Sequence, residues 1–126
     1  MNGILSPRVK PRWGVEFYED ETSCPVRDFL DGLDKFQRPK VLAAIKLLEE
    51  QGPTLPFPYS SQIRGKLREL RTRYGDDRYR VLYFGNPERV FVLLHAFTKR
   101  TDKTPPGDIA IAEARMKRYL ERHEED

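Results

Sequence analysis

One short stretch of the chain, Val90–Phe97 (VFVLLHAF), is apolar at almost every position. A run of this length and composition is typical of a strand that lies in the middle of a sheet and is buried on both faces. We therefore expect a central strand over Arg89–Thr98, around which the rest of the chain must fold.

Two more strand-like segments precede it, Lys66–Arg73 and Arg78–Phe84. The turn sequences Gly75-Asp76-Asp77 and Gly85-Asn86-Pro87-Glu88 separate the three segments, and connections this short join antiparallel neighbours. The sequence therefore predicts a three-stranded antiparallel meander. Charged residues are mixed into the first two strands, so we expect one face of each to be open to solvent or to a ligand.

A short strand and a helix are predicted near the N-terminus. Val15–Tyr18 lies in a segment that alternates apolar and polar residues, as a half-buried strand does. Thr22 or Ser23 is expected to cap the following helix, with Pro25 in its first turn.

A second helix is expected to follow and to end near Gln51, where Gly52-Pro53 stops it. Pro39 near its start is expected to disturb its first turn. The two helices together predict a helical hairpin. The residues expected on one apolar face of the second helix are Val41, Leu42, Ile45 and Leu48.

Residues 52–65 hold three prolines and show no hydrophobic period, which predicts a long loop. The last helix is expected over Gly107 to about Arg122, packed on the sheet. Its apolar stripe consists of Ile109, Ala112, Met116 and Tyr119. The predicted order is β-α-α-β-β-β-α, an α+β fold in a single domain 1–126, with a flexible leader at 1–12 and a frayed tail at 123–126.

Basic residues are concentrated in the meander. Residues 66–105 hold ten Lys/Arg and five Asp/Glu, whereas the rest of the chain holds thirteen Lys/Arg and fifteen Asp/Glu. The modest net charge of +3 therefore conceals a positively charged sheet on a slightly acidic body. Such a distribution favours a polyanionic ligand, and nucleic acid is the commonest one.

Several other classes of protein and site are disfavoured by the sequence. Cys24 is the single cysteine, so no intramolecular disulfide is expected. No metal-ligand spacing is present, and we expect no cofactor. The chain shows no signal-peptide pattern and no long apolar run, which predicts a cytoplasmic protein without a membrane partner.

Strand parity selects the first candidates for chemistry. Glu69, Arg71 and Arg73 are expected to share one face of their strand, opposite Arg68. Arg80 lies within an otherwise apolar run, where a guanidinium needs an anionic ligand or a partner. A salt bridge within the sheet, for example with Glu69, is the alternative role for Arg80.

Other polar and aromatic residues have two possible roles each. The segment Lys99–Thr104 carries three cations and two hydroxyls, which suits phosphate contacts or a solvated loop. Aromatic residues such as Tyr79 can stack on bases or fill the core. His95 is expected to be a core histidine rather than a catalyst.

The sequence lacks a paired-carboxylate signature, a Ser-His-Asp order and a glycine-rich phosphate loop. RNA cleavage is compatible with such a chain because the 2′-hydroxyl of the substrate is itself the nucleophile. Cations that neutralise the developing phosphorane charge can supply much of the rate. A lysine or tyrosine whose pKa is lowered by neighbouring arginines can accept the proton.

Three motifs resemble the RelE/ParE toxin superfamily, and within it the phage-derived HigB-like branch. They are Glu69–Arg71 (ELR), Tyr79–Phe84 (YRVLYF) and Leu93–Pro105 (LLHAFTKRTDKTP), and the resemblance extends over Val15–Tyr119. It implies a helical hairpin and a C-terminal helix on a curved antiparallel sheet, in agreement with the prediction from the residues.

The resemblance also implies a function: the toxin of a type II toxin–antitoxin module, which cuts mRNA on the ribosome without a metal and leaves a 2′,3′-cyclic phosphate. By matched motif, the catalytic residues would be Arg71, Arg80, Lys99 and Lys103. The RNA-binding residues would be Lys66, Arg68, Arg73, Tyr79 and Arg100. RelE itself carries a catalytic tyrosine near its C-terminus, where this chain offers Tyr119 within a predicted helix.

The implied partners are mRNA on the ribosome and a cognate antitoxin. The antitoxin is expected to carry a helix-turn-helix domain and to be the sole link to operator DNA. Two alternatives keep the fold but change the function. One is a ParE-like toxin that poisons DNA gyrase, and the other is a non-catalytic relative whose sheet binds a partner or nucleic acid.

Overall fold

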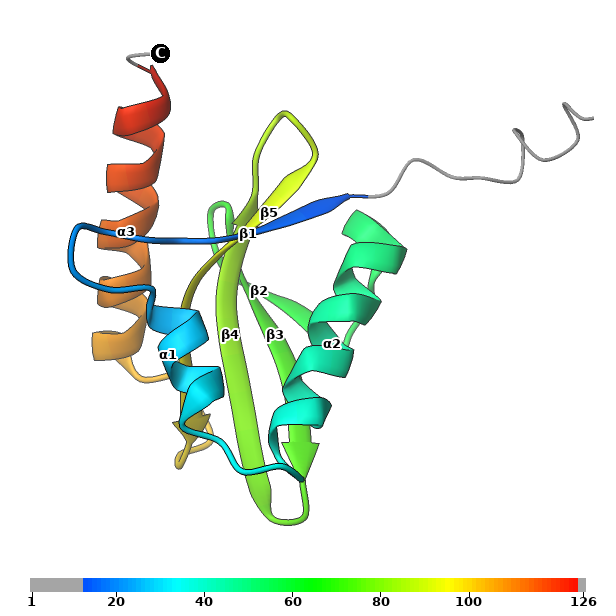
Figure 1. The fold of residues 1–126 in the computed structure, drawn as a ribbon. Coiled ribbons are helices and arrows are strands. Elements are labelled where there is room, and N and C mark those ends of the chain that lie inside the picture. The colour runs from blue at the N-terminus through cyan, green and yellow to red at the C-terminus, as the bar shows by residue number, and fades with distance from the viewer. Residues whose placement is uncertain (1–12, 125–126) are drawn as a thin grey trace, which may run out of the picture.

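The computed structural model describes residues 13–124 of the chain (Figure 1). The predicted leader 1–12 lies outside this range. The elements, in chain order, are β1 (Gly14–Phe17), α1 (Pro25–Asp31), α2 (Arg38–Gln51), the 3-10 helix η3 (Gly52–Thr54), β2 (Ser60–Arg64), β3 (Leu67–Tyr74), β4 (Asp77–Gly85), β5 (Val90–Lys99) and α3 (Pro106–Glu124). The α+β class and the order of the predicted elements are confirmed.

The sheet has five strands in the order β1-β5-β4-β3-β2. Strands β2 to β5 form an antiparallel meander, and β1 adds to the free edge of β5 in parallel. Apolar residues of β5 are buried on both faces, as its unbroken apolar run predicts. Gly75, in the β3–β4 turn, adopts a φ of 60°, a left-handed conformation that glycine accepts without strain.

Strand β2 corrects the prediction of a long loop over residues 52–65. Its sequence, SSQIR, has no hydrophobic period, and its one fully buried residue is Ser60. The Ser60 hydroxyl shares a hydrogen bond of 2.6 Å with the hydroxyl of Tyr83 and accepts one from Arg68 Nε. The strand is therefore held by its ladder with β3 and by polar contacts, which a hydrophobic pattern does not reveal.

Helices cover both faces of the sheet. Figure 1 shows α2 and α3 on opposite sides of it, and α1 packs on β5 in the same apolar core as α2. This first core also takes Leu70, Tyr79, Val81 and Leu93 from the sheet. The second core, beneath α3, takes Leu67, Leu82, Phe84, Val92 and Leu94 from the opposite face.

Two details of the N-terminal helices differ from the prediction. Thr22 and Ser23 do not cap α1, because the N-cap residue is Cys24 and the hydroxyls of Thr22 and Ser23 are turned to the carboxylate of Asp20. Leu42 is 45% exposed, so it does not belong to the buried face of α2. Pro39 lies in the first turn of α2, where a missing N–H leaves no intrahelical bond unmade.

The stripe predicted for α3 packs on the sheet. Ala112 and Tyr119 are buried in the second core, and Ile109 and Met116 pack against it. The helix extends to Glu124, so His123 and Glu124, assigned to the frayed tail from the sequence, are helical. None of the helices within residues 13–124 is long and apolar enough to cross a membrane.

Candidate active site

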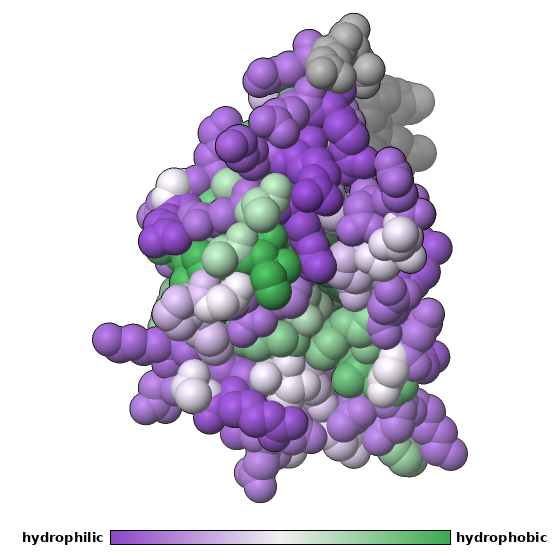
Figure 2. Space-filling view, turned by 90° about the vertical axis from the view of Figure 1, so that its left-hand side faces the viewer, coloured by the Kyte–Doolittle hydropathy of each residue, from purple (hydrophilic) through white to green (hydrophobic). Residues whose placement is uncertain are grey.

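The register of the sheet gathers basic side chains on the face that α3 partly covers. Arg71 pairs with Arg80, and Arg73 pairs with Arg78. Lys99 pairs with Arg78 from the other side. Directly opposed residues project from the same face of a sheet, so one end of this face carries a basic cluster, defined as Arg71, Arg73, Arg78, Arg80 and Lys99. The surface seen from the α3 side is mostly hydrophilic, with small hydrophobic areas (Figure 2).

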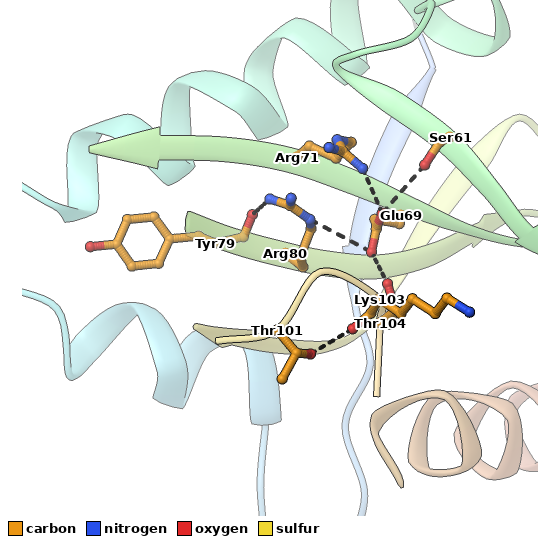
Figure 3. Close-up of polar contacts among 8 residues, drawn as sticks. All are labelled: Ser61, Glu69, Arg71, Tyr79, Arg80, Thr101, Lys103 and Thr104. Carbon is orange, nitrogen blue, oxygen red and sulfur yellow. Dashed lines mark hydrogen bonds and ion pairs between the residues drawn. The ribbon is translucent and has the colours of Figure 1, made fainter. Parts of the chain in front are cut away.

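A buried carboxylate lies beneath this cluster. Glu69 is 2% exposed, and its Oε2 accepts a hydrogen bond of 3.2 Å from Arg71 Nη1. Its Oε1 lies 3.7 Å from Arg80 Nε, which is the salt bridge considered as an alternative from the sequence. The hydroxyls of Ser61 and Thr104 also donate to Glu69, as Figure 3 shows.

Arg80 is held almost fully out of water. It is 4% exposed, and its Nη1 donates to the carbonyl of Tyr79 at 3.0 Å. Its buried Nε makes no hydrogen bond among the described residues. Burial lowers the pKa of the Arg80 guanidinium and Arg71 lowers it further, while Glu69 opposes the shift. One buried carboxylate thus serves both Arg71 and Arg80, and an added anion would be stabilised here.

Lys99 is the lysine of the cluster and is 7% exposed. Its Nζ makes no hydrogen bond within the part of the chain that the structure describes. Burial lowers the pKa of the Lys99 ammonium, and the positive charges of Arg80, Arg71 and Arg78 lower it further against the opposing effect of Glu69. A lysine in this environment releases its proton more readily than one in water, which suits proton transfer.

Other residues predicted for the site lie elsewhere. Arg68 belongs to the opposite face and binds Ser60. Tyr79 is 1% exposed and packs against Phe29, and in Figure 3 its ring points away from Glu69. Lys66 lies exposed in the turn between β2 and β3. The structure therefore does not bring these three side chains to the basic cluster.

The segment after β5 is exposed but internally bonded. Arg100 and Lys103 are exposed, and Figure 3 shows the Lys103 side chain directed away from Glu69. The Thr101 hydroxyl donates to the carbonyl of Lys103, and the Thr104 hydroxyl donates to Glu69. Both hydroxyls that sequence reasoning considered for phosphate contacts therefore hold the loop in place.

Both ring nitrogens of His95 have partners, as expected for a structural rather than a catalytic histidine. Its Nε2 lies 2.6 Å from Asp108 Oδ1, and its Nδ1 lies 3.2 Å from Arg115 Nη1. Both ring nitrogens are thus engaged with α3. Tyr119 also lies apart from the cluster, since its hydroxyl donates to Glu16 and accepts from Asn86. It lines a separate hollow of about 770 Å³ between β1, α1 and α3.

Sequence reasoning missed Arg78 as a member of the cluster, and it missed the contacts that Ser61 and Thr104 make with Glu69. Arg78 precedes Arg80 by two positions in β4, so strand parity alone could have placed it on the same face. Ser61 and Thr104 carry no comparable signal, because their contacts with Glu69 arise from the path of the chain. Within residues 13–124, no group of three or more His, Cys, Asp or Glu side chains is placed to hold a metal ion.

Comparisons with known proteins identify the family of the chain. The family model for phage-derived Gp49-like proteins matches residues 28–117. The chain is also 37% identical over 76 residues to a Mycobacterium tuberculosis protein named "Putative toxin HigB2". That alignment covers 56% of this chain and 38% of the relative, so the match spans well under half of the relative's length. The HigB-like resemblance is confirmed, and the chain belongs to the family of phage-derived Gp49-like proteins.

Proposed function

We propose that this protein is the toxin of a type II toxin–antitoxin module and that it inhibits translation by cutting mRNA on the ribosome. Membership of the Gp49-like family and similarity to a protein named as a HigB toxin support the toxin role. The observation that carries the nuclease role is the basic cluster, in which a buried arginine adjoins a buried lysine whose pKa is lowered. The proposed partner in the cell is a cognate antitoxin with a helix-turn-helix domain, through which operator DNA would be bound.

The proposed reaction is an attack by the 2′-oxygen of one nucleotide on the adjacent phosphorus. Neutral Lys99 takes the proton of the 2′-hydroxyl as the new O–P bond forms. The bond from phosphorus to the 5′-oxygen breaks, and that oxygen takes a proton from water. The products are a 2′,3′-cyclic phosphate and a 5′-hydroxyl, with no metal required.

Arg80 and Arg71 stabilise the charge that develops on phosphorus in this proposal. Both guanidiniums are positioned by Glu69 before substrate binds, so little reorganisation is needed as the negative charge grows. Arg73 is more exposed and would hold the RNA backbone.

The proposal is tested by primer extension on an mRNA in a reconstituted translation reaction. Wild-type protein is expected to cut at codon spacing only when ribosomes are present, and Arg80→Ala is expected to lower the cleavage rate about a hundredfold or more. Arg118→Ala, which removes an exposed arginine of α3, is the matched control and should cut normally.

Two results would overturn parts of this proposal. Cuts without ribosomes would indicate a free ribonuclease that uses the same sheet. If mRNA stays intact with the wild-type protein and with both variants, the protein is not a nuclease. Inhibition of DNA supercoiling by gyrase would then support the ParE-like alternative.

A further inference from the structure

The segment that leads into β2 leaves two aromatic rings in solvent beside the basic cluster. Phe57 is 69% exposed and Tyr59 is 50% exposed. The backbone of this segment is nevertheless held in place, because Arg71 N donates to the Tyr59 carbonyl at 2.8 Å and Tyr59 N donates to Pro56 at 2.9 Å. The backbone that carries the two rings is therefore held beside β3.

A groove of about 450 Å³ runs between Tyr59 and the basic cluster. Its volume lies within the range of small-molecule sites in proteins. Its lining contains no acidic residue. The cations that line it are Lys40, Arg71, Arg73, Arg78 and Arg80. The groove thus combines positive charge with one exposed aromatic ring.

Phe57 does not line the groove but contacts Arg71, which does. The Arg71 guanidinium carbon lies 5.3 Å from the centre of the Phe57 ring, and Nη1 of the same side chain donates to Glu69. A cation over an aromatic face is attracted by the ring. Arg71 is thereby held between Phe57 and Glu69, which leaves Tyr59 as the aromatic ring that lines the groove.

We propose that this groove is a subsite for one nucleotide of single-stranded RNA, with its base stacked on Tyr59 and its phosphates bound by Arg73 and Arg78. Aromatic stacking beside a cationic track is the general chemistry of single-strand recognition. An acidic peptide would use the cations but would leave the exposed ring without a planar partner. The assignment rests on the proposed function in that it takes RNA as the substrate.

The test uses Tyr59→Ala and Tyr59→Phe in the same mRNA cleavage reaction. Loss of the ring is expected to raise KM for ribosome-bound mRNA about tenfold or more with little change in kcat, because the contact binds substrate rather than reacting with it. Tyr59→Phe keeps the stacking face and should restore the wild-type KM. Phe36→Ala removes a ring that is 58% exposed and does not line the groove, and it should leave KM unchanged.

A second measurement does not depend on cleavage. A short single-stranded RNA that contains 5-bromouridine is crosslinked to the protein with light, and tryptic peptides are mapped. The adduct is expected on the peptide 47–64, which contains Tyr59, and is expected to disappear in Tyr59→Ala.

The two measurements separate the subsite from the reaction. If wild-type protein leaves mRNA intact but the crosslink maps to peptide 47–64, the proposed reaction fails and the subsite stands. A wild-type KM in Tyr59→Ala, or a crosslink that persists in it, would overturn the subsite. Loss of antitoxin binding in Tyr59→Ala with normal RNA cleavage would also overturn it and would assign the groove to a protein partner.

Discussion

At the scale of single residues, the arrangement of the site depends on Glu69. Glu69→Gln removes the carboxylate that faces Arg80 and Arg71, and it leaves a nearly buried guanidinium without its counter-ion. We expect a loss of about 3 kcal/mol in the free energy of unfolding, measured by urea denaturation. Glu113→Gln is the matched control. Glu113 also forms a close ion pair, 2.7 Å from Arg64, but that pair is exposed to solvent. A normal stability in Glu69→Gln, or an equal loss in the control, would contradict this role.

Lys99 makes the nuclease proposal testable by pH. Its pKa is lowered, so the neutral amine that accepts a proton is more abundant at any given pH than for a lysine with the ordinary value of 10.5. The cleavage rate should therefore rise with pH and level off below 10.5. Lys99→Arg keeps the charge but removes the proton acceptor, and it should cut about a hundredfold more slowly. Lys117 is an exposed residue of α3, so Lys117→Arg should retain the wild-type dependence of the cleavage rate on pH. A wild-type cleavage rate that does not change with pH would exclude Lys99 as the base.

For single residues, the sequence predicts which face of a strand a side chain lies on better than it predicts whether that side chain is buried. Parity correctly separates Arg71 from Arg68, since period two is a property of any strand. The burial of Lys99 and Arg80 depends on tertiary packing that strand parity does not contain, for example on the loop after β5, whose Thr104 donates to Glu69. The same dependence explains why Tyr79, an RNA-binding candidate, lies in the core.

At the scale of elements, α2 provides a test of the fold. Leu48 is fully buried in the first core, whereas Leu42 is 45% exposed, although both were expected on one apolar face. Leu48→Ala should lower the free energy of unfolding by about 3 kcal/mol, because it leaves a cavity against the sheet. Leu42→Ala should change it by less than about 0.5 kcal/mol. Equal effects in urea denaturation would mean that α2 packs in a different rotation.

Strand β2 shows where element prediction fails for this chain. Four of the five sheet strands were predicted, because each has an apolar alternation or an apolar run. An edge strand needs no such pattern, since pairing with β3 supplies its backbone hydrogen bonds. The consequence for the site is direct, because β2 begins beside Arg71 and Tyr59, the residue before its first residue, thereby lies at the groove.

At the scale of the whole molecule, the proposed function depends on which part of the sheet the helices leave uncovered. α1 and α2 cover one face, whereas α3 packs over the end of the other face that carries Leu82, Phe84 and Val92. The uncovered end carries the basic cluster. The concentration of charge in residues 66–105 was visible in the sequence, but its collection on one face required the register of β3, β4 and β5.

The most direct test of the central claim is to determine the end groups of mRNA fragments produced in a translation reaction. The account predicts 2′,3′-cyclic phosphate and 5′-hydroxyl ends with wild-type protein, and about a hundredfold slower release of such fragments with Arg80→Ala. Intact mRNA, or fragments with 5′-phosphate ends, would contradict it, because 5′-phosphate ends require attack by water rather than by the 2′-hydroxyl.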